Sequence, residues 1–295
     1  MLAKASLVAH LGPAQPEGMT ERNSTKVWFV TGASRGFGRL WTEAILQRGD
    51  LVAATARDPH SLDDLVATHG EALLPLQLEV TDRNAVFDAL RRAADRFGQL
   101  DIVLNNAGYG HFGAVEELAE AEIRDQMETN FFGALWALQA ALPIMREQGG
   151  GHLVNVTSEG GVRAYAGIGA YHASKWALEG LSESLAKEVR DLGIRVTNIE
   201  PGPYRTGWLE VGSRQSKPIA AYDRLREDVD TFEVGDPVAT VPALFAVVDA
   251  EEPPLRVFFG KPFEAVRAEH MARIAEWERW QDVALSAFEP EAAVR

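Results

Sequence analysis

Short apolar runs alternate along the chain with segments of helical periodicity, and this alternation is the feature that most restricts the fold. The runs are continuous rather than alternating in polarity, which is typical of parallel strands covered on both faces. We therefore predict an α/β fold in three layers, with a doubly wound parallel sheet between helices. The predicted strands cover residues 27–30, 51–55, part of 72–80, 100–104, 152–157, 195–199 and 255–259.

Helical spacing of apolar residues fills the intervals between these runs. In residues 82–97, for example, Val86, Leu90 and Ala93 recur at positions i, i+4 and i+7. The predicted helices cover residues 38–47, 62–68, 82–97, one or two segments within 116–147, 170–191, 236–248 and 263–287.

The chain shows no internal repeat and no low-complexity linker between residues 25 and 290, so we predict a single domain at residues 25–262. We expect residues 1–24 to form a flexible tail, within which Met19 is an alternative natural start. We expect residues 263–295 to form a helical extension that covers the body. Residues 201–233 are irregular, and a long irregular excursion is usually a functional lid or binding loop. We assign the substrate loop to about residues 203–233.

The charge of the chain argues against two kinds of partner. Asp and Glu total 43 against 29 Lys and Arg, and the formal net charge is −14. Such a chain repels nucleic-acid phosphates and anionic membrane surfaces, so we expect neither as a partner. The absence of cysteine excludes disulfides, cysteine-zinc sites and cysteine nucleophiles, and we predict no metal site. No apolar run suits a membrane span or a signal peptide, so we expect a cytoplasmic protein.

A glycine-rich turn follows the first predicted strand and opens the first predicted helix. Glycines let the backbone turn tightly and approach a ligand closely, and the start of a helix favours a phosphate group. At this place in a βαβ unit the turn indicates a dinucleotide site. The alternative is a tight strand–helix connection without a ligand. The residues that would hold the cofactor here are Gly32, Ser34, Arg35, Gly36, Phe37 and Gly38.

The same turn fits a second interpretation, from a different class of enzyme. Gly32-x-Ser34-x-Gly36 matches the nucleophile elbow of a serine hydrolase. That mechanism needs an Asp or Glu and then a His further along the chain. His172 and His270 are candidates, but their spacing singles out neither, and an elbow directly after the first strand is unusually early.

The end of the second predicted strand indicates which cofactor is bound. A dinucleotide site often places a carboxylate about 20 residues past the glycines, where it binds the ribose 2′-hydroxyl. This chain has Arg57 there, with no carboxylate before Asp58, and Arg35 projects toward the same place. Two guanidinium groups suit a 2′-phosphate, so NADP(H) is favoured over NAD(H). Alternatively, Arg57 faces solvent and pairs with Asp58 or Asp63.

Three side chains have the types and spacing of an acid–base site. Tyr171 and Lys175 stand at positions i and i+4, on one face of a predicted helix. A tyrosine has an ordinary pKa of about 10, and a nearby ammonium group and a positively charged nicotinamide would together lower it toward the working pH. Ser158 directly follows a predicted strand, where its hydroxyl could bond a substrate oxygen. His172 points elsewhere on the helix, and we expect it to be structural.

Together these pieces resemble the short-chain dehydrogenase/reductase family, over about residues 26–260. The matching pieces, in order, are Thr31-Gly32-x-x-x-Gly36-x-Gly38, Asn105-Asn106-Ala107-Gly108, Asn130, Ser158, Tyr171-x-x-x-Lys175 and Pro201-Gly202. The resemblance implies a Rossmann-type fold with strand order 3-2-1-4-5-6-7. It also implies a homo-oligomer, either a dimer or a tetramer.

The resemblance also implies a role for each matching residue. Tyr171 would be the general acid/base, Ser158 would orient the carbonyl, and Lys175 would bind the nicotinamide ribose and lower the pKa of Tyr171. Asn130 would hold a water that links Lys175 to solvent. The family's usual Asp-Val after the third strand is Glu79-Val80 here, so the adenine contact rests more on the Val80 backbone. The other implied cofactor contacts are Asn105, Asn106, Ala107, Gly108, Pro201, Gly202 and Thr206.

We therefore predict an NADP(H)-dependent oxidoreductase that interconverts a ketone or aldehyde and an alcohol by hydride transfer. The expected substrate residues are mostly aromatic, which favours a lipophilic carbonyl compound, although some of them could be core residues instead. A non-catalytic NADP-binding regulator is the remaining alternative; such proteins generally lose the Tyr or the Lys, and this chain has both. Residues expected to border the pocket are Ser158, Tyr109, His111, Phe112, Glu159, Tyr165, Tyr204 and Trp208.

Overall fold

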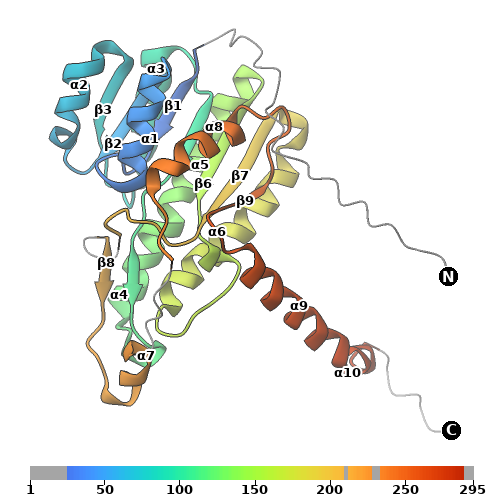
Figure 1. The fold of residues 1–295 in the computed structure, drawn as a ribbon. Coiled ribbons are helices and arrows are strands. Elements are labelled where there is room, and N and C mark those ends of the chain that lie inside the picture. The colour runs from blue at the N-terminus through green and yellow to red at the C-terminus, as the bar shows by residue number, and fades with distance from the viewer. Residues whose placement is uncertain (1–24, 209–211, 228–232, 289–295) are drawn as a thin grey trace, which may run out of the picture.

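A parallel sheet forms the centre of the computed structural model, which describes residues 25–208, 212–227 and 233–288 (Figure 1). Within this part of the chain the sheet has seven strands in the order β3-β2-β1-β4-β6-β7-β9, and every pairing is parallel. The predicted Rossmann-type strand order is therefore confirmed. The strands are β1 (Val27–Val30), β2 (Leu51–Ala56), β3 (Leu73–Gln77), β4 (Ile102–Asn105), β6 (Gly151–Val156), β7 (Ile194–Pro201) and β9 (Arg256–Phe259). The tail predicted at residues 1–24 lies outside the described residues.

Helices cover both faces of the sheet and make the fold three-layered (Figure 1). Side chains of α1, α2 and α8 pack on one face, and side chains of α3, α5 and α6 pack on the other. These helices are α1 (Gly36–Gln47), α2 (Asp63–His69), α3 (Arg83–Phe97), α5 (Gly133–Gln148), α6 (Gly169–Glu188) and α8 (Thr240–Val248). The segment predicted to hold one or two helices contains α4 (Glu120–Met127), a π-helical turn (Glu128–Phe132) and α5 in succession.

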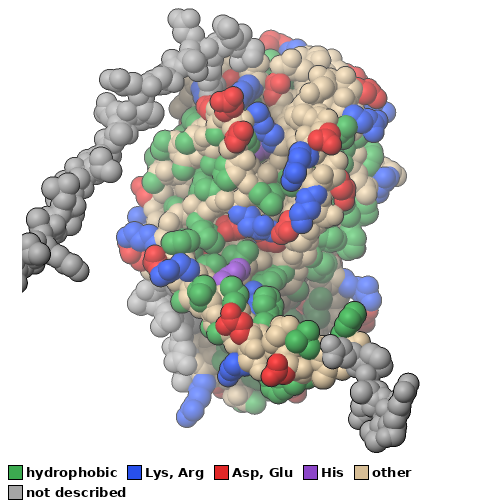
Figure 2. Space-filling view, turned by 90° about the vertical axis from the view of Figure 1, so that its right-hand side faces the viewer, with side chains coloured by type: hydrophobic (Ala, Val, Ile, Leu, Met, Phe, Trp, Pro, Cys, Tyr) green, Lys and Arg blue, Asp and Glu red, His purple; other side chains and the backbone are tan. Residues whose placement is uncertain are grey.

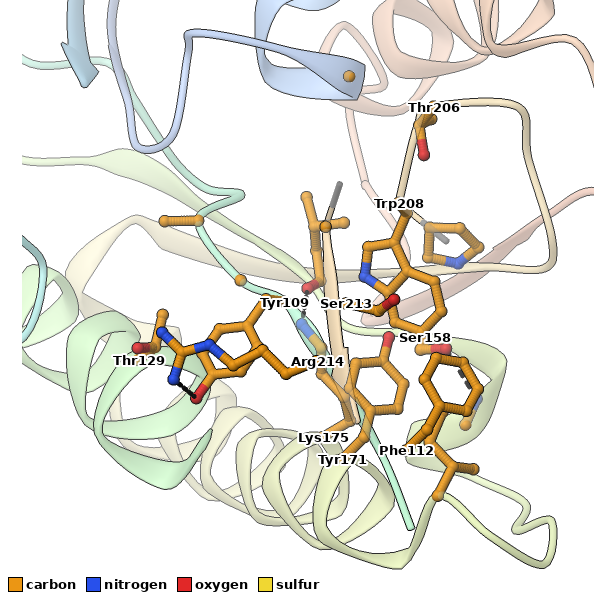
Figure 3. A pocket seen from close by; sticks show the side chains of 18 of the residues that line it. Tyr109, Phe112, Thr129, Ser158, Tyr171, Lys175, Thr206, Trp208, Ser213 and Arg214 are labelled. Carbon is orange, nitrogen blue, oxygen red and sulfur yellow. Dashed lines mark hydrogen bonds between the residues drawn. The ribbon is translucent and has the colours of Figure 1, made fainter. Parts of the chain in front are cut away.

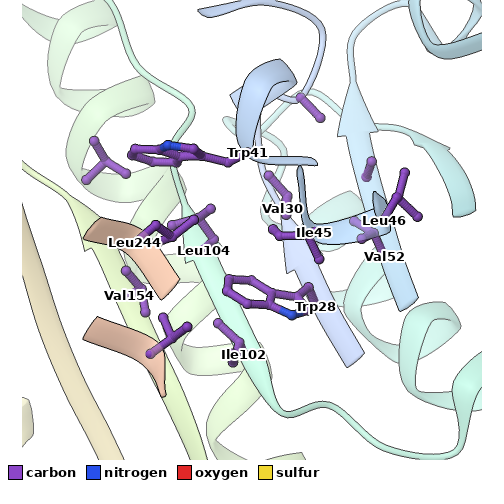
Figure 4. Packing of buried hydrophobic residues seen from close by; sticks show 14 of the residues in the cluster. Trp28, Val30, Trp41, Ile45, Leu46, Val52, Ile102, Leu104, Val154 and Leu244 are labelled. Atoms are coloured by element: carbon purple, nitrogen blue, oxygen red, sulfur yellow. The ribbon is translucent and has the colours of Figure 1, made fainter. Parts of the chain in front are cut away.

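Two tryptophans anchor the α1 side of the core (Figure 4). Trp28 on β1 and Trp41 on α1 are fully buried. A buried indole N–H needs an acceptor. The indole of Trp28 donates to the Asp50 carboxylate at 3.0 Å, and that of Trp41 donates to the Thr240 hydroxyl at 2.8 Å. The second contact ties α1 to the start of α8, so the core also fixes the helix that begins at the glycine turn.

The excursion after β7 contains more structure than the sequence predicts. β8 (Ser213–Gln215) pairs in parallel with β5 (Gly110–Phe112) in a separate two-stranded sheet. A short helix, α7 (Asp223–Glu227), follows it. The expectation of an irregular loop is thus wrong for these residues, because the pairing with β5 supplies order that no local pattern indicates. The pairing brings the predicted substrate loop beside the segment that follows β4.

The C-terminal extension is helical, but it does not cover the body. α9 (Phe263–Arg279) and α10 (Gln281–Ser286) project away from the sheet (Figure 1). Val266 near the start of α9 is buried, whereas Trp277 and Trp280 are 64% and 60% exposed. The expectation of a covering helix is therefore wrong. Beyond its first turns α9 extends past the edge of the body. The apolar side chains there, such as Trp277, are mostly exposed, because the described residues of the body do not bury them.

Candidate active site

A cavity of about 1310 Å³ lies at the carboxyl ends of the central strands. Parallel sheets present their ligands at this edge. Figure 3 shows Ser158, Tyr171, Lys175 and Trp208 around it. The predicted site residues that line the cavity are Gly32, Ser34, Arg35, Gly36, Phe37, Arg57, Glu79, Val80, Asn106, Ala107, Gly108, Tyr109, Phe112, Ser158, Glu159, Tyr165, Tyr171, Lys175, Pro201, Gly202, Tyr204, Thr206 and Trp208.

The glycine turn forms one wall of the cavity in a conformation that needs glycine. Gly32 and Gly36 have φ of +69° and +55°, a region that side chains disfavour. The turn leads into α1, whose first turn holds no acidic residue and whose N-cap, Arg35, makes no capping bond among the described residues. The first N–H groups of α1 are therefore available to an anion, as a pyrophosphate site requires.

The end of this wall nearest β2 carries two positive charges without a carboxylate partner among the described residues. Arg35 and Arg57 are exposed and line the cavity. In the described residues neither guanidinium pairs with a carboxylate. Asp58 instead accepts from the backbone N–H of His60, and Asp63 faces the His60 ring. The alternative in which Arg57 pairs with one of these carboxylates is therefore not what the structure shows.

The predicted acid–base group is assembled on the opposite side of the cavity. The side chains of Ser158 and Tyr171 lie next to each other at the cavity (Figure 3). Burial raises the pKa of Tyr171 to about 12, although its interaction with Ser158 acts in the opposite direction. The Lys175 ammonium lies 5.8 Å from the centre of the Tyr171 ring and donates to the Val156 backbone oxygen at 2.8 Å. Burial lowers the pKa of Lys175 to about 8. In the chain by itself burial dominates the pKa of Tyr171. The lowering of this pKa by Lys175 together with a bound nicotinamide stays a prediction.

Asn130 lies beside this group but behind the cavity wall. It belongs to the π-helical turn between α4 and α5, and such turns are frequent at functional sites. Its side chain bonds both backbone groups of Tyr109, accepting from the N–H at 3.1 Å and donating to the oxygen at 2.9 Å. It also donates to the Ser174 hydroxyl at 3.1 Å. Asn130 thus fixes the segment that follows β4; its role with a water remains a prediction.

Several predicted positions lie elsewhere. Asn105 is buried and donates to the Asn155 side chain at 2.9 Å, so it is not part of the wall. His111 is also buried, 2.8 Å from the Ser216 hydroxyl, and the prediction that it borders the pocket is wrong. Gly38 stands behind the wall, where a Cβ would overlap the Gly32 oxygen and the Asn106 amide.

His172 and His270 do not support the hydrolase interpretation. His172 has one ring nitrogen 2.8 Å from the Gly160 oxygen, and the other accepts from the Tyr165 N–H at 2.9 Å. This confirms a structural role for His172, although the residue also borders the cavity. His270 contacts the Val162 oxygen at 2.9 Å. Both imidazole rings contact backbone groups of the segment that follows Ser158, so neither is placed to act as a general base for Ser34.

Aromatic rings surround the Tyr171 phenol. Trp208 meets the Tyr171 ring edge to face, with centroids 5.3 Å apart, and Phe112 meets Trp208 in the same way at 5.8 Å. Sequence reasoning missed Arg214 on β8, whose guanidinium lies 4.5 Å from the centre of the Tyr109 ring on the cavity wall (Figure 3). Arg214 reaches the cavity wall because β8 pairs with β5, and no local sequence pattern predicts that pairing.

Across residues 25–208, 212–227 and 233–288 there is no cluster of three metal-ligating side chains. Over the same residues, none of the helices has both the length and the apolar character needed to span a membrane.

Comparisons with known proteins agree with this geometry. A family model described as short chain dehydrogenase matches residues 26–216. Oxidoreductase BOA17 of Botryotinia fuckeliana is 38% identical over 275 residues, which are 89% of this chain and 99% of that protein. The crystal structure of a short-chain dehydrogenase from Streptomyces avermitilis has 39% identity and a TM-score of 0.83, over 89% of this chain and 99% of that one. An alcohol dehydrogenase from Thermococcus sibiricus, solved with 5-hydroxy-NADP, has 26% identity and a TM-score of 0.68, over 80% and 96%.

Proposed function

The chain belongs to the short-chain dehydrogenase/reductase family of oxidoreductases, and we propose that it is an NADP(H)-dependent reductase of lipophilic ketones or aldehydes. The observation that carries the proposal is the placement of Ser158 beside Tyr171, with Lys175 on the same helix face as Tyr171, in the wall of a cavity that also contains the glycine turn (Figure 3).

The cofactor would lie along the glycine-turn wall. The N–H groups at the start of α1 would hold its pyrophosphate, and Arg35 and Arg57 would bind the 2′-phosphate of NADP(H). The absence of any described carboxylate partner for these arginines supports NADP(H) over NAD(H). When bound, the cofactor supplies the hydride that reduces the carbonyl carbon.

The residues of the chain supply the proton. Ser158 donates a hydrogen bond to the carbonyl oxygen and orients it beside Tyr171. Tyr171 then gives its phenolic proton to that oxygen as the alcohol forms, and it accepts the proton back in the oxidising direction. Its raised pKa keeps the phenol protonated at neutral pH, which favours reduction. The charged Lys175 stabilises the phenolate that remains after the transfer.

The substrate portion of the cavity suits an apolar molecule. Phe112, Tyr165 and Trp208 form a largely aromatic wall near Tyr171. Such walls favour lipophilic substrates over charged sugars. The substrate loop at about residues 203–233 and a homo-oligomeric assembly, a dimer or a tetramer, belong to the same proposal, and size-exclusion chromatography with light scattering measures the assembly.

Initial-rate assays test the proposed function. NADPH oxidation is followed with acetophenone and with longer aryl and alkyl ketones, and each assay is repeated with NADH. We expect turnover of apolar ketones with NADPH and a preference for NADPH over NADH in kcat/KM. A panel in which no ketone or aldehyde is reduced contradicts the proposed reaction, and a preference for NADH contradicts the cofactor assignment.

A further inference from the structure

One polar cluster interrupts the aromatic wall directly beside Ser158. The Glu159 carboxylate lines the cavity, and its side chain is only 12% exposed. The Tyr165 phenol lines the same cavity, and its interaction with Glu159 lowers the pKa of that carboxyl, although burial raises the pKa overall. The cluster is close to the reacting group, since Glu159 follows Ser158 in the chain and its charge contributes to raising the pKa of Tyr171.

Two helices hold the backbone of this cluster in place. From α6, His172 bonds the Gly160 oxygen and the Tyr165 N–H. From α9, the His270 ring lies 2.9 Å from the Val162 oxygen. The first half of α9, which includes His270, therefore contacts the body and stabilises the backbone of the cavity wall. A carboxylate fixed in this way is preorganised for recognition.

The cluster has an excess of negative charge. Arg163 Nη1 lies 3.8 Å from the Glu159 carboxylate, while Arg163 Nε lies 3.2 Å from the Glu269 carboxylate on α9. The single guanidinium of Arg163 therefore lies near two carboxylates. Its central carbon, Cζ, also lies 4.4 Å from the centre of the Tyr165 ring. At 3.8 Å the pair with Glu159 is too long for a direct hydrogen bond. A buried carboxylate with acceptor capacity left over favours a hydrogen-bond donor in the cavity.

We propose that Glu159, supported by Tyr165, recognises a hydrogen-bond donor, either a hydroxyl or a protonated amine, close to the carbonyl of an otherwise lipophilic substrate. This inference rests on the proposed reductase function and specifies its substrate class. The same carboxylate disfavours an anionic substituent at that place, because two like charges would be desolvated together. Figure 2, viewed from the side toward which α9 projects, shows acidic, basic and hydrophobic side chains side by side on this face.

Matched substrates test the proposal in the intact protein. The substrates are acetophenone, its α-hydroxy and α-amino derivatives, and benzoylformate, which share the aryl ketone and differ in the added group. The variants are Glu159→Gln, which keeps the size and removes the charge, and Tyr165→Phe, which removes only the hydroxyl. Glu188→Gln on the exposed end of α6 is the control, because its carboxylate bonds Ser184 far from the cavity wall.

We expect the parent enzyme to prefer the hydroxy and amino ketones over acetophenone in kcat/KM. Glu159→Gln should lower that preference about 10- to 100-fold for the amine, the usual effect of losing a charged hydrogen bond, and less for the hydroxyl. It should also raise the kcat/KM for benzoylformate relative to the kcat/KM for acetophenone, both measured with the same variant. Tyr165→Phe should lower both preferences in part, and Glu188→Gln should lower neither.

The readouts separate the two proposals. Acetophenone turnover by the parent enzyme reports on the reductase function, whereas the ratios between substrates report on Glu159. If acetophenone is reduced but the ratios of Glu159→Gln and Tyr165→Phe stay within twofold of the parent, the recognition role is wrong. If Glu159→Gln does not fold, unchanged ratios in Tyr165→Phe alone contradict it.

Discussion

The side-chain amide of Asn106 donates a hydrogen bond to the backbone oxygen of Gly32 at 3.0 Å, across 74 residues of sequence. The same amide donates to the Thr31 oxygen at 3.0 Å. The turn that starts α1 and the segment that follows β4 are therefore fixed together at the carboxyl edge of the sheet. Gly38 lies directly against this contact, because any Cβ there would overlap both bonded groups.

Gly38→Ala tests whether this contact shapes the cofactor wall. We expect a loss of stability of about 1–3 kcal/mol, the usual cost of overpacking, and a large rise in the Kd of NADPH. Urea unfolding and fluorescence titration with NADPH measure the two effects.

Gly180→Ala is the matched control within a helix. Gly180 is an exposed residue of α6, and no described atom lies within 4 Å of a Cβ placed there. Alanine should stabilise the helix by about 0.5–1 kcal/mol and leave NADPH affinity unchanged. Equal NADPH affinity in both variants would show that the Asn106–Gly32 contact does not shape the site.

Arg57→Ala tests the assignment of the 2′-phosphate. Loss of a charged hydrogen bond typically costs about 1.5–3 kcal/mol, so we expect the Kd of NADPH to rise about 10- to 100-fold. The Kd of NADH should stay near its parent value, since NADH has no 2′-phosphate. Arg91→Ala is the control, because Arg91 pairs with Asp88 on the surface of α3. A parallel loss of affinity for NADH would contradict the assignment.

The sequence was sufficient for those parts of the fold that local patterns encode. Continuous apolar runs predicted every strand of the main sheet, and the order of those strands followed from the family resemblance. The pairing of β5 with β8 could not be predicted, because each strand is three residues long and the register depends on tertiary contact. The projection of α9 was also missed, since the sequence predicts a helix but not where it points.

In the site, too, local sequence patterns predicted some residues, whereas features that depend on tertiary structure were missed. Ser158, Tyr171 and Lys175 follow from fixed local spacing, and all three line the cavity. His111 was misplaced because successive side chains of a strand point to opposite sides, so Phe112 faces the cavity and His111 does not. The raised pKa of Tyr171 depends on burial, which spacing alone does not reveal.

His152 should make stability depend on pH. Burial lowers the pKa of His152 from 6.5 to about 4, and the ring bonds the Thr197 hydroxyl. The unfolded chain therefore binds a proton below about pH 6.5 that the folded chain takes up only near pH 4. Stability is full above 6.5 and falls as the pH drops through this window, by about 2 kcal/mol at pH 5.

Urea unfolding at pH 7.5 and pH 5 measures this dependence. His152→Gln should lose about 2 kcal/mol less than the parent between the two pH values. His60→Gln is the control, since the His60 side chain is 82% exposed, and it should retain the dependence of the parent. An identical pH dependence in His152→Gln and the parent would contradict the attribution.

The central claim is that Tyr171 donates the proton to the substrate oxygen, and Tyr171→Phe measures it most directly. We expect NADPH-dependent ketone reduction to fall about 100- to 10,000-fold, the usual contribution of a general acid, with the Kd of NADPH within twofold of the parent. Glu188→Gln, which removes a surface carboxylate bonded to Ser184, should retain the parent rate. Reduction by Tyr171→Phe at the parent rate would contradict the account.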